Sequence, residues 1–111
     1  MHQLSKREKK IARQCIDKGL DAEFREGLQI TAAIIQDWSS GKFESNREAY
    51  HALYRAISTK DRAIGRRYDD LGGSSWLITV ASIFSDGYIS EVDIKDFSDE
   101  AKAVIRFFNK E

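Results

Sequence analysis

Proline is absent from this chain of 111 residues, and that absence favours long, uninterrupted helices. Proline is the strongest helix breaker, because it lacks the backbone N–H and its ring clashes with the preceding turn. Helix-start signals recur along the chain, each a Ser followed three residues later by an acid, as in Ser5/Glu8 and Ser90/Asp93. The sequence therefore predicts an all-α fold, a compact bundle of five or six helices, in a single helical domain over residues 1–111.

Cysteine and histidine are scarce: Cys15, His2 and His51 are the only ones. A lone cysteine can form no internal disulfide, which is typical of a reducing compartment, so a cytoplasmic location is expected. The three residues do not have the spacing of a metal site. Asp86-Gly87 resembles the centre of a calcium-binding loop, but Phe84 stands where that loop needs an oxygen ligand. We therefore expect neither a metal nor another cofactor.

Long apolar runs are also missing. The first ten residues are basic and polar with no apolar segment, unlike a signal peptide. The longest uncharged apolar run, residues 72–85, is too short to cross a bilayer. We expect no membrane partner.

The chain has no net charge, yet its charges are segregated. Residues 1–20 hold six bases and two acids, and residues 21–50 hold three and six. Residues 51–71 hold five bases and three acids, and residues 72–111 hold four and seven. Alternating patches can cancel within one fold or guide self-association, so a homo-oligomer stays open. They do not produce the strong basic field of a dedicated nucleic-acid binder.

Apolar periodicity predicts where the helices lie. A first helix over residues 5–17 is expected to stop at Gly19, and a second to begin at Asp21 and end at residues 39–41. A third helical stretch begins at Ser45 or Asn46; it either continues unbroken to Leu71 or, as we favour, breaks near Ser58. The segment 76–84 fits either a helix or a strand; we favour a helix, with a short hairpin around residues 84–94 as the alternative.

The third stretch carries a seam with four- and three-residue spacing: Tyr50, Tyr54, Ile57, Asp61, Ile64, Tyr68 and Leu71. Such a stripe presents one helix face to a partner surface. Asp61 is its exception, because a carboxylate on a buried face is costly unless it is paired. A helix break near Ser58, or pairing with Arg62 or Arg66, would resolve that cost.

Apolar positions along the whole chain, including two from this seam, predict the core. It is expected to contain Phe24, Leu28, Ile35, Trp38, Leu53, Ile57, Ile64, Trp76, Ile78, Val80, Ile83, Ile94, Val104, Ile105 and Phe108. The wide apolar arc over residues 24–38 indicates a helix that is contacted on two sides.

Candidate partner-binding residues gather on the third stretch, where tyrosines and arginines offer contact and charge. They are Tyr50, Tyr54, Arg62, Arg66, Arg67 and Tyr68. Neighbouring acids, among them Asp61 and Asp69, pair with these arginines at helical spacing.

No catalytic motif is present, and no stretch identifies a family. We therefore expect a small non-enzymatic binding protein, an adaptor, inhibitor or immunity-type factor that acts on another protein. The alternative is a nucleic-acid-binding helical protein that uses the face of Arg62, Arg66 and Arg67 and the amino-terminal basic run, Lys6 to Arg13. An enzyme with Asp and Arg residues in a cleft is a third reading, because missing motifs do not exclude one.

Overall fold

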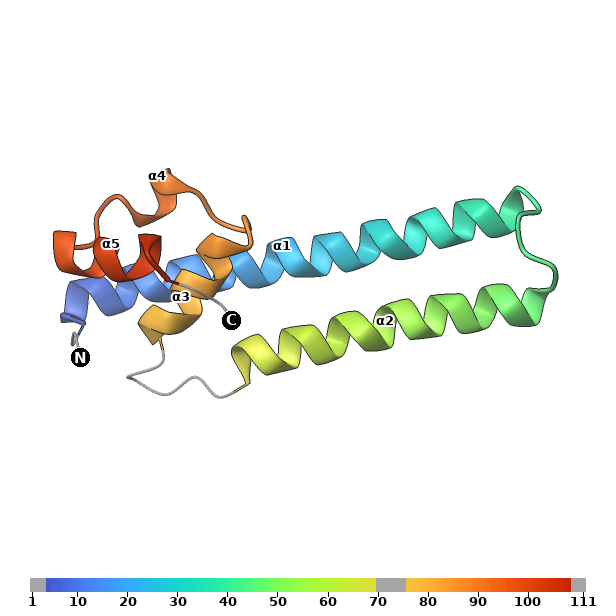
Figure 1. The fold of residues 1–111 in the computed structure, drawn as a ribbon, viewed down its shortest axis with the longest axis horizontal. Helices are drawn as coiled ribbons and strands as arrows, with labels where there is room; N and C mark the ends of the chain where they lie inside the picture. The colour runs from blue at the N-terminus through green and yellow to red at the C-terminus, as the bar shows by residue number, and fades with distance from the viewer. Residues whose placement is uncertain (1–3, 70–75, 109–111) are drawn as a thin grey trace.

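The computed structural model describes residues 4–69 and 76–108, which form five helices and, within those ranges, no strand (Figure 1). In chain order the helices are α1 (Lys6–Ser39), α2 (Asn46–Tyr68), α3 (Trp76–Ser85), α4 (Glu91–Ile94) and α5 (Asp99–Arg106). The all-α class is confirmed. The alternative hairpin around residues 84–94 is wrong, because α3 continues to Ser85 and α4 begins after a turn at Gly87, whose φ is 82°.

The helices begin where the capping signals predict. Hydroxyl oxygens of three serines accept a backbone N–H in the first turn: Ser5 at α1, Ser45 at α2 and Ser98 at α5. At α4 the Asp93 carboxylate accepts the N–H of Ser90 at 2.7 Å. Each contact satisfies a backbone donor that the helix itself leaves unpaired, so short polar side chains fix the helix starts.

The breaks expected within the two long helices are wrong. The first helix continues through Gly19 for 34 residues, and α2 continues through Ser58 for 23 residues. A Cβ at position 19 would lie 2.6 Å from Ile83 Cγ2, so glycine there permits close packing of α3 instead of ending the helix. Asp61 is exposed and therefore needs neither a helix break nor a buried partner.

The two long helices form an antiparallel hairpin, and α3, α4 and α5 gather around the first half of α1 (Figure 1). The molecule measures 54 × 25 × 24 Å with a radius of gyration of 17.5 Å. A compact chain of this length would have a radius of gyration of about 13 Å, so the bundle is more extended than the compact one predicted. We call residues 24–64 the arm and the other described residues the base.

The hydrophobic core lies in the base. Ala12, Cys15 and Ile16 of α1 are buried there against α3, α5 and the segment between them. Of the predicted core, four residues are buried: Val80, Ile83, Ile94 and Ile105. Ile64, Trp76, Val104 and Phe108 are partly buried and pack against this cluster. Leu53 is partly buried in the arm.

Candidate functional site

The arm has almost no interior of its own. Between residues 24 and 64, Ala49 is the one buried residue. The placement of six residues in the core is therefore wrong: Phe24, Leu28, Ile35, Trp38 and Ile57 in the arm, and Ile78 in the base, are exposed. In the arm the reason is geometric, because each of two paired helices buries only the stripe that faces the other. The wide apolar arc of α1 lacks the second neighbour that the sequence predicted.

The uncovered residues form one continuous surface along the arm, which we call the apolar face. It comprises Phe24, Leu28, Thr31, Ile35 and Trp38 from α1, and Tyr50, Leu53, Ile57 and Ile64 from α2. The residues of α1 follow each other at intervals of four and three, so they share one side of the helix. Between the two helices this surface is hollowed twice, by about 380 Å³ near the base and about 230 Å³ near the tip.

The apolar face is large for a monomer. Six of its nine side chains are exposed, with exposed fractions from 46% at Trp38 to 69% at Leu28 and 70% at Tyr50. If a large side chain contributes about 200 Å², the apolar face exposes on the order of 700 Å². The largest apolar patch on a typical monomer is about 300–600 Å², and a specific protein interface buries about 800 Å² on each partner. The apolar face thus has the size of an interface.

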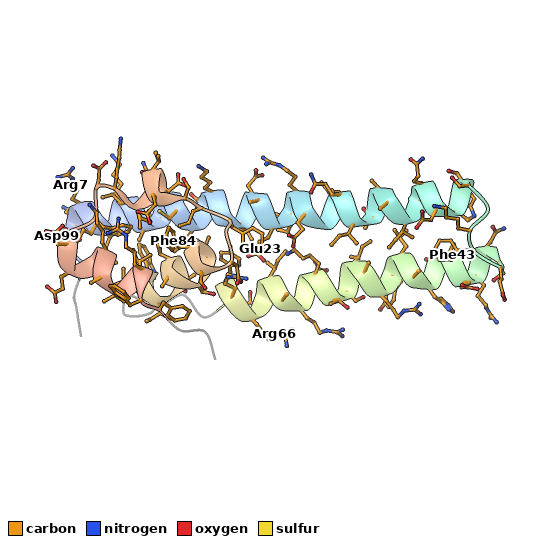
Figure 2. All side chains as sticks on the ribbon, turned by 45° about the horizontal axis from the view of Figure 1, so that its top comes forward. Arg7, Glu23, Phe43, Arg66, Phe84 and Asp99 are labelled. Atoms are coloured by element: carbon orange, nitrogen blue, oxygen red, sulfur yellow. The ribbon has the colours of Figure 1, made fainter. Side chains whose placement is uncertain are left out.

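A buried ionic cluster fixes the arm to the base. Glu23 of α1 is 1% exposed and receives two cations from α2. Lys60 Nζ donates to its Oε1 at 3.2 Å, and Arg67 Nε lies 3.0 Å from its Oε2, an ion pair without hydrogen-bond geometry. Figure 2 shows Glu23 directed into this junction. A buried carboxylate is tolerated because both its oxygens face a positive charge.

The cluster extends to the turn after α3. Tyr88 donates to Glu26 Oε1 at 2.8 Å and accepts from Lys60 Nζ at 3.1 Å. Arg67 donates to Ser82 at 2.8 Å and to Asp86 at 2.5 Å. The base, α1 and α2 therefore share one polar network, which sets the register between the two long helices and the base.

The network shifts the pKa of its members. Desolvation lowers the pKa of Lys60, but hydrogen bonds to Glu26, Tyr88 and Glu23 outweigh it, and that pKa is raised overall. Hydrogen bonds from Lys60 and Tyr88 lower the pKa of Glu26. Burial, reinforced by the Glu23 carboxylate, raises the pKa of Tyr68. All these shifts favour the ion pairs and the neutral phenol at neutral pH, so the cluster has a structural role.

The predicted binding residues fall into two groups. Tyr50 and Tyr54 are 70% and 66% exposed; Tyr50 lines the tip hollow, and Tyr54 follows it four residues later in the seam. Arg66 is exposed and projects away from α1, as Figure 2 shows. Arg67 and Tyr68 instead belong to the interior, Arg67 in the ionic cluster and Tyr68 in the core. Leu71 lies outside the described residues.

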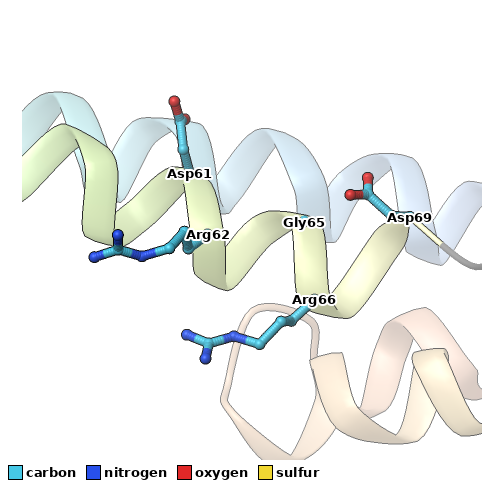
Figure 3. A pocket seen from close by; sticks show the side chains of 5 residues that line it. All are labelled: Asp61, Arg62, Gly65, Arg66 and Asp69. Atoms are coloured by element: carbon cyan, nitrogen blue, oxygen red, sulfur yellow. The ribbon is translucent and has the colours of Figure 1, made fainter.

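The exposed arginines line an open hollow of about 500 Å³ on α2 (Figure 3). Arg62 and Arg66 extend to one side of Gly65, while Asp61 and Asp69 point to another. A Cβ on Gly65 would lie 3.0 Å from Asp69 Oδ2, so the carboxylate closes over the helix surface. Two cations and two anions together offer no net attraction for a phosphate backbone.

The amino-terminal basic run lies on the exposed side of α1, with its bases in solvent. Arg13 covers the ring of Trp76, with its guanidinium carbon 5.4 Å from the ring centroid. Lys18 pairs with Asp93 at 2.8 Å, so acids of the base approach this helix. The run is the solvated side of an end helix that packs on the base.

The two reactive residue types do not meet. Cys15 is buried in the base, where burial raises the pKa of its thiol to about 11. His51 is exposed near the tip of the arm, about 30 Å away along the helices at 1.5 Å per residue. Among residues 4–69 and 76–108, no three His, Cys, Asp or Glu side chains gather where they could hold a metal ion. Within the same ranges no helix is long and apolar enough to span a bilayer.

Comparison of the chain with protein-family models, curated proteins and solved structures finds no match. Sequence reasoning found the apolar arc of α1 but assigned it to the core, and it missed the roles of Glu23 and Lys60. One signal was available: Gly19, Glu23 and Gly27 are spaced by four residues, so Glu23 shares its helix side with two glycines that allow close approach.

Proposed function

We propose that this chain is a small non-enzymatic binding protein that contacts helices of another polypeptide chain through the apolar face of its arm. An adaptor, an inhibitor or an immunity-type factor would each work by occupying a surface in this way. The observation that carries the proposal is the apolar face itself, an area on the order of 700 Å² above an arm in which only Ala49 is buried.

The shape of the apolar face favours a helical partner. Both hollows lie between the antiparallel helices α1 and α2, and the α1 residues that line them repeat at intervals of four and three. Helices pack by inserting side chains from one such row into the gaps of another. Tyr50, Tyr54 and Trp38 add the large aromatic side chains that dominate binding energy in protein interfaces.

The nucleic-acid alternative has weaker support. Of its three arginines, Arg67 is engaged with Glu23 and Asp86, and Arg62 and Arg66 share their hollow with two aspartates. A phosphate backbone would meet carboxylates there as often as guanidinium groups. We therefore treat nucleic acid as an outcome of the test and not as a second proposal.

The test is photo-crosslinking inside living cells that produce the protein. The photoreactive amino acid p-benzoylphenylalanine replaces Tyr54 at the rim of the apolar face, or Phe107 as a control. Phe107 is an equally aromatic residue, 84% exposed, at the end of α5 in the base. We expect a discrete protein adduct from position 54 and none of the same mass from position 107. Identical adducts from both positions, or adducts to nucleic acid alone, would defeat the proposal.

A further inference from the structure

We propose that the partner on the apolar face is a second copy of this chain, so that two arms form an antiparallel four-helix bundle. This inference rests on the proposed function and names its partner. It follows from what the arm lacks. A two-helix hairpin leaves one side of each helix uncovered, and a second hairpin supplies the two helices that close a four-helix core.

The first argument is the fit of length and spacing. Apolar residues recur along the apolar face from Phe24 and Ile64 at the base to Trp38 and Tyr50 at the tip. Lys60 and Asp61, which also line the hollow near the base, are the charged residues beside them. The apolar face extends about 21 Å along α1, at 1.5 Å per residue. A second arm presents residues of the same spacing over the same length, so the apolar positions of one arm face those of the other. The intervals of four and three match the packing of four-helix bundles.

The second argument is charge. Within the arm, residues 24–39 of α1 carry two acids and one base, whereas residues 46–64 of α2 carry four bases and two acids. When two arms pair about a two-fold axis along their length, each α1 lies between its own α2 and the α2 of the partner. Every pair of neighbouring helices then has opposite net charge. Opposite charges across an interface favour correct pairing and speed association.

The third argument is area. Burying the apolar face on both copies would remove on the order of 1,400 Å² from water, within the range of about 1,200–2,000 Å² for specific interfaces. The contact would bury apolar and aromatic side chains at its centre.

The test is sedimentation velocity of the full chain at about 1–100 µM, because interfaces of this area dissociate in the micromolar range or below. One variant, Leu28→Glu, places a charge at the centre of the apolar face, where Leu28 is 69% exposed and supports no part of the core. The matched control, Ala33→Glu, places the same charge on an exposed site of the same helix, about 140° around it. Circular dichroism verifies that both variants stay helical.

We expect the wild type and Ala33→Glu to sediment as dimers, and Leu28→Glu to dissociate with a constant raised about 30-fold or more, the loss typical of a central interface residue. A monomeric wild type throughout the range would overturn the inference. A Leu28→Glu chain that dimerises like the wild type would also overturn it, because the dimer would then use another surface.

The crosslinks from position 54 separate this failure from failure of the proposed function. An adduct of twice the mass of the chain supports the pairing. An adduct to a different protein, from a chain that sediments as a monomer, overturns the second copy as partner but keeps the proposed function. No protein adduct at all overturns both.

Discussion

The close approach of α3 at Gly19 allows the packing of the base to be tested with a matched pair of substitutions on one helix. Gly19 and Gly27 both lie within α1, and replacing either by alanine gains helix propensity of about 1 kcal/mol. At position 27 the new methyl group would lie 3.3 Å from Lys60 Cγ, which can yield slightly. We therefore expect Gly27→Ala to stabilise the protein by about 0.5 kcal/mol.

At position 19 the surroundings reverse the sign. The methyl group would lie 2.6 Å from Cγ2 of Ile83, a side chain with 0% exposure, and 3.1 Å from the Tyr68 hydroxyl oxygen. Overpacking of this kind costs about 1–3 kcal/mol, which exceeds or cancels the propensity gain. Gly19→Ala should therefore be less stable than Gly27→Ala by roughly 1–3 kcal/mol.

Urea unfolding followed by far-ultraviolet circular dichroism measures the difference. With a slope of about 1–2 kcal/mol/M for a chain of this size, the midpoints of the two variants should differ by about 0.5 M or more. Equal slopes would verify that both variants unfold from the same fold. Coincident midpoints would refute the reasoning, since α3 could not then pack against α1 at Gly19 as described.

Three other predictions concern titratable groups. Glu23→Gln should destabilise the protein by about 3 kcal/mol, because it removes the buried carboxylate that faces both Lys60 and Arg67. Glu26→Gln, at a side chain that is 46% exposed, should cost about 1 kcal/mol or less, and equal losses in urea melts would contradict the buried cluster. Cys15, 3% exposed with a pKa of about 11, should react with a disulfide reagent at neutral pH only after unfolding; rapid reaction of the native chain would count against its burial. The pKa values of Glu26 and Asp93 are lowered by hydrogen bonds from Lys60 and Lys18, respectively, against opposing desolvation. These two carboxylates therefore stabilise the protein fully at pH values above their ordinary pKa values of 4.5 and 3.8, and this stabilisation is lost as the pH falls through their lowered pKa values. A urea midpoint that stays constant down to about pH 3 would disprove this pH dependence.

Local signals in the sequence predicted the helix starts, because a capping contact involves residues only three positions apart. Ser5 and Ser45 cap the helices whose starts were predicted there. The same kind of signal failed at Ser58, where the surrounding residues already favour helix. Within a continuous helix, the backbone N–H groups that follow such a serine already donate to helix carbonyls, so the serine does not mark a helix start. No local rule separates the two cases.

Long-range packing could not be derived from one sequence. Gly19 has the appearance of a helix end, and only the position of Ile83, 64 residues later in the sequence, makes it a point of close approach. The apolar arc from Phe24 to Trp38 predicted a helix with neighbours on two sides, but the structure gives this part of α1 one neighbour, α2. Periodicity does not say whether the second neighbour belongs to the same chain, and here the described residues leave the position open.

An arm without an interior also divides the chain into regions of unequal local stability. Two helices that contact each other along a single stripe open easily, because that contact adds little to their stability. An isolated helix shorter than about 12–15 residues is marginal in water. Amide hydrogens near the tip, around residues 36–47, should therefore exchange with solvent faster than those of α3, whose side chains fill the core. Under the proposed pairing, mass action stabilises the arm as the protein concentration rises. Exchange at the tip would then slow with concentration, while exchange in the base would stay nearly constant.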